Sequence, residues 1–144
     1  MIKKIALGTV QFGVDYGVAN KGGQVSLKEV KNILKLATEK GIDTLDTAIA
    51  YGESERVLGV VGVNQFDLIT KLPSIPETDD VSSWVSHQII ESKERLGVKK
   101  LKGVLLHRPL ELLEPRGRNI YEALLELKQH KSVEKIGLSV YQPS

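Results

Sequence analysis

The sequence contains no cysteine in its 144 residues. This absence excludes disulfide bridges, zinc sites built on thiolates and catalysis by a cysteine nucleophile. His87 and His130 lie in polar stretches of predicted helix, where a surface position is much commoner than a metal-ligand role. We therefore assign no metal site.

Long apolar runs are also missing. No segment approaches the roughly 20 apolar residues that a membrane-spanning helix needs, and the N-terminal MIKKIALGTVQFG lacks the apolar core of a signal peptide. A hydrophobic content of 41% and a charged content of 26% are typical of a globular domain. We expect one cytoplasmic domain over residues 1–144, without a membrane partner.

Charge of one sign is not concentrated anywhere along the chain. The chain has twenty basic and eighteen acidic residues, its formal net charge is +2, and residues of both signs are scattered along it. Nucleic-acid binding would require a basic stripe, so we expect no nucleic-acid partner.

Short apolar segments alternate with amphipathic ones along the whole chain. Strands are predicted at 2–8, 42–46, 67–71, 102–107 and 133–139, and helices at 26–40, 53–62, 81–96 and 118–130. Residues 11–24 are predicted to form a loop, and 108–117 a loop with one helical turn. Such alternation indicates a parallel sheet, either an open doubly wound sheet or a closed (β/α)8 barrel. GTVQFG after the first strand is not the G-x-G-x-x-G of dinucleotide-binding open sheets.

Local signals mark the ends of two helices. Ser26 and Glu29 have the spacing of a capping box before the first long helix. Asp79 or Asp80 is predicted to cap the helix over 81–96, and Gly97 to end it.

Polar residues stand where the predicted strands end. Gly8 and Thr9 stand at the end of the first predicted strand. The other four predicted strands end at Asp46, Lys71, His107 and Ser139, in that order. Each alone is most simply a turn residue or a solvated charge. In a parallel α/β fold, however, these ends share one rim, where active sites lie. With Tyr51 nearby, a carboxylate that holds an ammonium beside a phenol forms a plausible proton-transfer group.

Four motifs together resemble the aldo-keto reductase superfamily. They are DTAIAYGESE (46–55), ITK (69–71), LLHRP (105–109) and IGLS (136–139), and the resemblance runs from LGTVQFG to GLSVYQP. It implies a (β/α)8 TIM barrel, a small-molecule carbonyl substrate and a nicotinamide cofactor, usually NADPH and otherwise NADH.

The resemblance also implies roles for individual residues. Tyr51 would be the general acid, Lys71 would assist it, Asp46 would anchor Lys71, and His107 would orient the carbonyl group. The cofactor-binding residues would be Gly8, Thr9, Asp46 and Ser139. Many members of the family carry Asn after this serine, where the present sequence has Val140.

The sequence ends after the fifth predicted strand, whereas a complete barrel has eight. We expect an incomplete barrel of about five β/α units, inactive as a chain of this length and prone to self-association through its exposed edges. A non-catalytic binding or assembly module is the alternative. A Schiff-base lyase using Lys71 ranks last, because Asp46 would favour the charged ammonium over the neutral amine.

Overall fold

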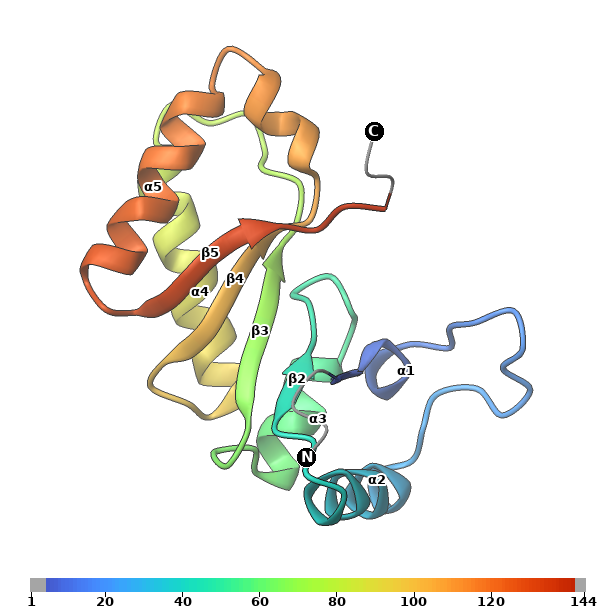
Figure 1. The fold of residues 1–144 in the computed structure, drawn as a ribbon. Helices are drawn as coiled ribbons and strands as arrows, with labels where there is room; N and C mark the ends of the chain where they lie inside the picture. The colour runs from blue at the N-terminus through green and yellow to red at the C-terminus, as the bar shows by residue number, and fades with distance from the viewer. Residues whose placement is uncertain (1–4, 142–144) are drawn as a thin grey trace.

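Five parallel strands form one sheet in the computed structural model, which describes residues 5–141. The strands are β1 (Ala6–Gly8), β2 (Thr44–Asp46), β3 (Asp67–Leu72), β4 (Leu101–Leu106) and β5 (Val133–Leu138), in the order β1-β2-β3-β4-β5 (Figure 1). This matches the parallel sheet predicted from the sequence. The predicted residues 2–4 of the first strand lie outside the described residues.

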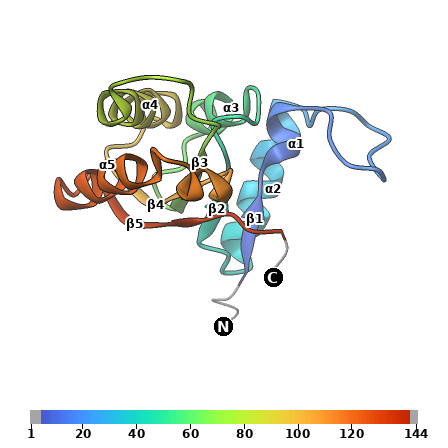
Figure 2. The ribbon, with the colours of Figure 1, turned by 90° about the horizontal axis from the view of Figure 1, so that it is seen from above.

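The helices follow the strands in regular alternation. They are α1 (Val10–Gly13), α2 (Leu27–Glu39), α3 (Ser54–Val61), α4 (Val81–Leu96) and α5 (Gly117–Gln129), with a 3-10 helix η1 (Pro109–Leu113). Figure 2 shows α3, α4 and α5 on the same side of the sheet. No helix within residues 5–141 is long and apolar enough to cross a membrane.

The prediction of a loop over residues 11–24 was wrong at its start, where α1 forms a single helical turn. Gly13 explains why this turn exists. A Cβ atom at Gly13 would lie 1.8 Å from the carbonyl oxygen of Tyr51 and 2.3 Å from the amide nitrogen of Ser54. The turn is therefore stabilised by close packing against the start of α3, which no local pattern reveals.

Helix ends follow the predicted capping signals closely. Ser26 Oγ accepts a hydrogen bond from the Glu29 amide at 3.3 Å, whereas the Glu29 carboxylate accepts one from Asn32 at 3.1 Å instead of completing the capping box. Of the two candidate caps for α4, Asp80 is the one that accepts from the Ser83 amide, at 2.9 Å. Gly97 ends α4 with a φ of 68°.

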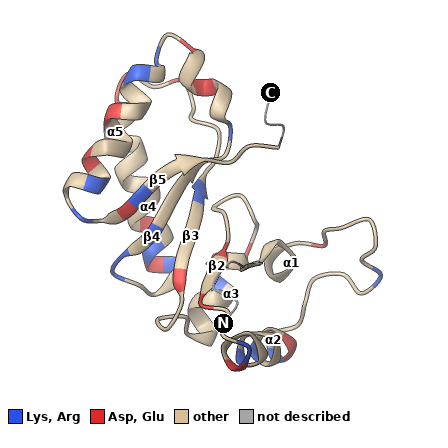
Figure 3. Cartoon of the chain, viewed as in Figure 1, with Lys and Arg blue, Asp and Glu red and all other residues tan. Residues whose placement is uncertain are grey.

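The hydrophobic core lies between the sheet and its helices. The strands contribute Leu45, Leu68, Leu72, Val104 and Leu106, and the helices contribute Leu34, Leu58, Val85, Ile89, Ile120 and Leu124. Side chains alternate across a strand, so Leu68, Thr70 and Leu72 face the helices while Lys71 points to the opposite face. Figure 3 shows that acidic and basic residues are intermixed along the described part of the chain.

Candidate active site

The predicted polar residues meet at one edge of the sheet. Asp46 is the last residue of β2, Lys71 lies one residue before the end of β3, and His107 and Ser139 directly follow β4 and β5. Parallel pairing brings these ends side by side: Asp46 aligns with Ile69, and Lys71 with Leu105.

Lys71 is the centre of the group. Its ammonium donates a hydrogen bond to Asp46 Oδ1 and another, of 3.0 Å, to the carbonyl oxygen of Thr47. The Lys71 side chain is only 6% exposed, whereas that of Asp46 is 39% exposed. A buried ammonium is costly unless it is paired, so Asp46 explains how Lys71 is accommodated, and Lys71 explains the carboxylate at the end of β2.

Tyr51 completes the contact on the other side of the ammonium. Lys71 Nζ lies 3.5 Å from the Tyr51 hydroxyl and 5.0 Å from the centre of its ring. The ring of His107 meets that of Tyr51 edge to face, with 5.9 Å between centroids and 81° between planes. The structure therefore brings together all four residues that the sequence assigned to catalysis.

The turn that presents Tyr51 depends on the glycine beside it. Gly52 has a φ of 54°, and a Cβ atom there would lie 2.6 Å from the carbonyl oxygen of Gly13. The amide of Ser54 donates to the Tyr51 carbonyl at 3.0 Å, which starts α3 immediately afterwards. Glycine thus allows the turn to pack against α1 while Tyr51 faces Lys71.

Burial lowers the pKa of His107 below its usual 6.5, and the charge of Lys71 lowers it further, while Asp46 acts in the opposite direction. The lowered pKa favours the neutral form of the imidazole. A neutral imidazole carries one N–H donor, which is what a hydrogen bond to a carbonyl oxygen requires.

Thr9 lies behind the site rather than on its surface. It is fully buried, and both its amide and its hydroxyl donate to the carbonyl oxygen of Asp46, at 3.0 and 3.1 Å. Ser54 Oγ in turn donates to the carbonyl oxygen of Thr9 at 2.9 Å and lies 3.1 Å from Thr47 Oγ1. Gly8, by contrast, is exposed at the end of β1. The hydroxyl groups of Thr9, Thr47 and Ser54 thus fix the backbone around Asp46.

Glu55 is a residue whose structural importance the sequence did not show. It is 2% exposed. Its Oε1 accepts hydrogen bonds from Thr70 and Ser92, both at 2.7 Å, and its Oε2 accepts one from Arg95 Nε at 2.8 Å. Arg95 Nη2 is buried and has no partner among the described residues. Glu55 therefore joins α3, β3 and α4 directly behind Lys71.

A cleft of about 880 Å³ opens beside His107. Its walls are the segment after β3, the η1 loop and the end of β5, and Ser139 lies in it. The Ser139 amide donates to the Leu106 carbonyl at 3.0 Å, while its hydroxyl has no hydrogen-bond partner among residues 5–141. The serine is thus held by its backbone, and none of the described residues binds its hydroxyl.

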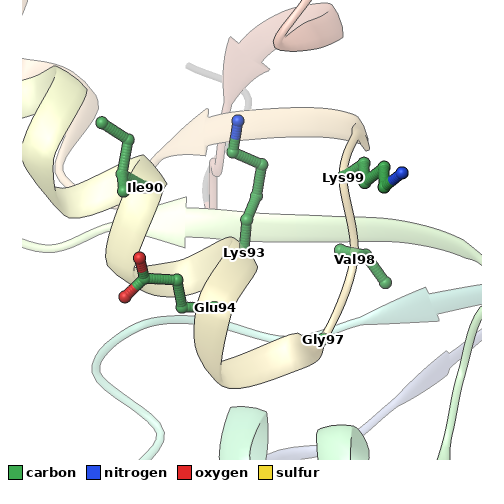
Figure 4. A pocket seen from close by; sticks show the side chains of 6 residues that line it. All are labelled: Ile90, Lys93, Glu94, Gly97, Val98 and Lys99. Atoms are coloured by element: carbon green, nitrogen blue, oxygen red, sulfur yellow. The ribbon is translucent and has the colours of Figure 1, made fainter.

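A second hollow, of about 400 Å³, lies at the C-terminal end of α4 (Figure 4). It is lined by residues from Ile90 to Lys99 and contains none of the predicted site residues. It lies next to the start of β4, at the opposite end of the sheet from Lys71 and His107. The cleft beside His107 is therefore the one that belongs to the candidate site.

Comparison with known proteins is consistent with this geometry. The sequence model of the Aldo/keto reductase family matches residues 4–144. The candidate aldo-keto reductase PA4992 from Pseudomonas aeruginosa is 31% identical and superposes with a TM-score of 0.78, over 93% of this chain and 54% of its own. No curated protein matches the sequence.

Two more distant structures share the fold. The holo form of the aldo-keto reductase AKR11C1 from Bacillus halodurans is 22% identical and superposes with a TM-score of 0.74, over 96% of this chain and 46% of its own. An aldo-keto reductase from Klebsiella pneumoniae in complex with NADPH is 19% identical and superposes with a TM-score of 0.70, over 96% of this chain and 45% of its own. The chain spans about half the length of these proteins, and its sheet corresponds to part of a (β/α)8 barrel. Because the family model matches residues 4–144, the chain belongs to the aldo/keto reductase family.

Proposed function

We propose that this chain carries the proton-transfer residues of an NAD(P)H-dependent reductase of aldehydes or ketones. One observation supports this proposal above the others: a single buried ammonium, Lys71 Nζ, contacts both the Asp46 carboxylate and the Tyr51 hydroxyl at the rim of the sheet. Such a group suits a reaction in which a proton must be delivered to an oxygen that gains negative charge.

Tyr51 is the proton donor in this proposal. Its hydroxyl gives a proton to the carbonyl oxygen, and the Lys71 charge 3.5 Å away stabilises the phenolate that remains. Asp46 keeps the ammonium in place. His107, whose pKa is lowered by burial and then by the nearby lysine, donates a hydrogen bond that orients the carbonyl group beside Tyr51.

The residues around this rim fit a nicotinamide nucleotide. Gly8 is exposed, and a Cβ atom added there would meet nothing within 4 Å, so a flat ring can approach the end of β1 closely. Ser139 offers an unpaired hydroxyl to an amide group, and half-exposed Asp46 offers its second carboxylate oxygen. When bound, the nucleotide would supply the hydride. NADPH is the cofactor proposed, as in the Klebsiella pneumoniae complex.

The open edges of the sheet bear on whether residues 1–144 suffice for activity. Among the described residues, β1 pairs only with β2, and β5 only with β4. An unpaired edge is a template for another strand. Because the chain covers only 54% of the Pseudomonas aeruginosa structure, we propose that residues 1–144 alone associate through these edges and turn over little or no substrate.

The test of the function uses residues 1–144 completed to a full barrel by a C-terminal half, fused or in trans, with NADPH and a reactive aldehyde. Tyr51→Phe is expected to lower kcat/KM by about 10²- to 10⁴-fold, the range for loss of a general acid. Tyr121→Phe, a change of the same kind at an exposed position on α5, should leave the rate unchanged. Equal rates for the wild type and Tyr51→Phe would contradict the proposal.

A further inference from the structure

Arg108 differs from every other arginine in the chain. Arg56, Arg95, Arg116 and Arg118 each have a carboxylate within 4.0 Å, at Glu53, Glu55, Glu114 and Glu122 respectively. Arg108 has neither an ion-pair partner nor a side-chain hydrogen bond among residues 5–141. Its guanidinium keeps all five N–H donors for another molecule.

Arg108 lines the cleft beside His107, where a carbonyl substrate of the proposed reaction would enter. Its backbone is held extended, with φ of −119° and ψ of 84°, as expected for a residue before proline. The amide of Glu111 donates to its carbonyl oxygen at 3.1 Å. The position of the Arg108 backbone is therefore fixed, although its side chain is exposed.

The acidic residues of the cleft are mostly engaged elsewhere. Glu111 Oε1 accepts from Ser74 Oγ at 2.7 Å and from the Ile75 amide at 3.1 Å, and lies 3.8 Å from Arg116. Glu111 Oε2 is buried without a partner. Glu114 is paired with Arg116 at 3.2 Å. Glu77 also lines the cleft, and it has no ion pair with Arg108 or any other described residue.

We propose that the cleft receives carbonyl substrates that also carry an anionic group, a carboxylate or a phosphate, and that Arg108 binds this group. This inference rests on the proposed function and specifies its substrate class. Arg is suited to planar, two-point recognition of such anions. With the carbonyl oxygen at Tyr51 and His107 and the anion at Arg108, a substrate is held at both ends.

The test compares two aldehydes that differ in charge and otherwise only by a methyl group, 4-carboxybenzaldehyde and its methyl ester, with NADPH and residues 1–144 completed to a full barrel. The wild type should favour the carboxylate in kcat/KM. Arg108→Gln should lower kcat/KM for the carboxylate by about 10- to 100-fold, the value of a hydrogen bond to a charged group, and leave the ester unchanged. Arg108→Lys should retain part of the preference, and added salt should weaken it only for the charged substrate.

Glu77→Gln is the matched control, because it changes the charge of the same cleft by one unit without touching Arg108. It should alter the preference far less than Arg108→Gln does. An equal and opposite effect would mean that only the net charge of the cleft matters, and would overturn direct binding by Arg108. Glyceraldehyde and its 3-phosphate test whether phosphate is the anion bound. If it is, Arg108→Gln should lower kcat/KM for the 3-phosphate and leave that for glyceraldehyde unchanged.

Other outcomes separate this inference from the proposed function. Equal use by the wild type of acid and ester, and also of glyceraldehyde and its 3-phosphate, would overturn the inference while leaving the reductase in place. An Arg108→Gln variant that loses affinity for NADPH but keeps its substrate preference would also overturn it. If neither aldehyde is reduced, the proposed function fails, and NMR titration with 4-carboxybenzyl alcohol decides the anion site directly: binding that depends on Arg108 supports the site, and no binding overturns it.

Discussion

Two neighbouring regions of the rim are built in different ways. Around Asp46, Tyr51 and Lys71, polar groups are backed by buried partners, with Thr9 bonded to the Asp46 carbonyl and Glu55 bonded to Thr70. Around the cleft after β4, the side chains of Arg108, Leu110 and Tyr141 are exposed, Leu110 in the short helix η1 and the other two outside any helix or strand.

The difference follows from what each region has to do. Proton transfer requires a fixed distance between donor and acceptor, and residues on strands with buried support keep such distances. Recognition of the far end of a substrate tolerates movement and benefits from open N–H donors, which loops provide. Changes in the first region should therefore affect all substrates alike, and changes in the cleft should affect only some.

Lys71→Met is expected to have the largest effect. It keeps most of the length of the side chain and removes the charge that stabilises the Tyr51 phenolate, so kcat should fall by about 10²- to 10⁴-fold. The loss should be the same for charged and neutral aldehydes, unlike that of Arg108→Gln. Asp46, being 39% exposed, remains solvated, so circular dichroism should show a folded protein. A loss of kcat confined to charged substrates would contradict the distinction between the two regions.

Glu55→Ala is expected to have the next largest effect, on stability. It leaves the Arg95 guanidinium, itself 22% exposed, without its carboxylate, and removal of one partner of a buried ion pair costs about 3–5 kcal/mol. Urea unfolding measures this change in the free energy of unfolding. The double variant Glu55→Met, Arg95→Met should recover part of the loss, because no unpaired charge remains. A loss below about 1 kcal/mol, typical of surface pairs, would show that Glu55 is not the support proposed.

The sequence predicted the parts of the site that depend on local pattern. The alternation of segments placed Asp46, Lys71 and His107 at successive strand ends, and parallel pairing then put them at one edge. The caps at Ser26 and Asp80 and the end of α4 at Gly97 could also be read directly, because the signal and its consequence lie within a few residues.

The support behind the site could not be predicted, because its contacts join distant segments. Ser54 reaches Thr9 across 45 positions, and Glu55 reaches Arg95 across 40. Helix α1 depends in the same way on Gly13 packing against the turn of Tyr51. Without the fold, Glu55 is only one more charged residue at the start of a predicted helix.

The pH dependence of His107 tests how closely the two regions are coupled. Its pKa lies below 6.5 in the folded state, through burial and then the Lys71 charge. The unfolded chain therefore binds this proton at higher pH than the folded one, so the free energy of unfolding should fall as pH drops from about 6.5 to the folded pKa. His107→Gln should flatten that part of the curve.

NMR titration of the His107 ring separates the causes. Lys71→Met should raise the pKa of His107, because a repelling charge is removed, and Asp46→Asn should lower it further, because an attracting charge is removed. If Lys71→Met leaves the pKa unchanged, burial alone is responsible and the ammonium does not influence the entrance of the cleft.

Glu114→Gln is expected to have the smallest effect, although it too removes a carboxylate from an arginine. The Glu114 side chain is 48% exposed, and exposed pairs contribute about 0–1 kcal/mol. Arg116 also keeps its hydrogen bonds to the carbonyl oxygens of Pro76 and Ile75, at 2.6 and 2.7 Å. Urea unfolding should therefore show a loss of less than about 1 kcal/mol, against several for Glu55→Ala. Similar losses for the two variants would mean that the cleft wall is as tightly held as the support behind Lys71, and the contrast between a fixed proton-transfer group and an adaptable cleft would have to be abandoned.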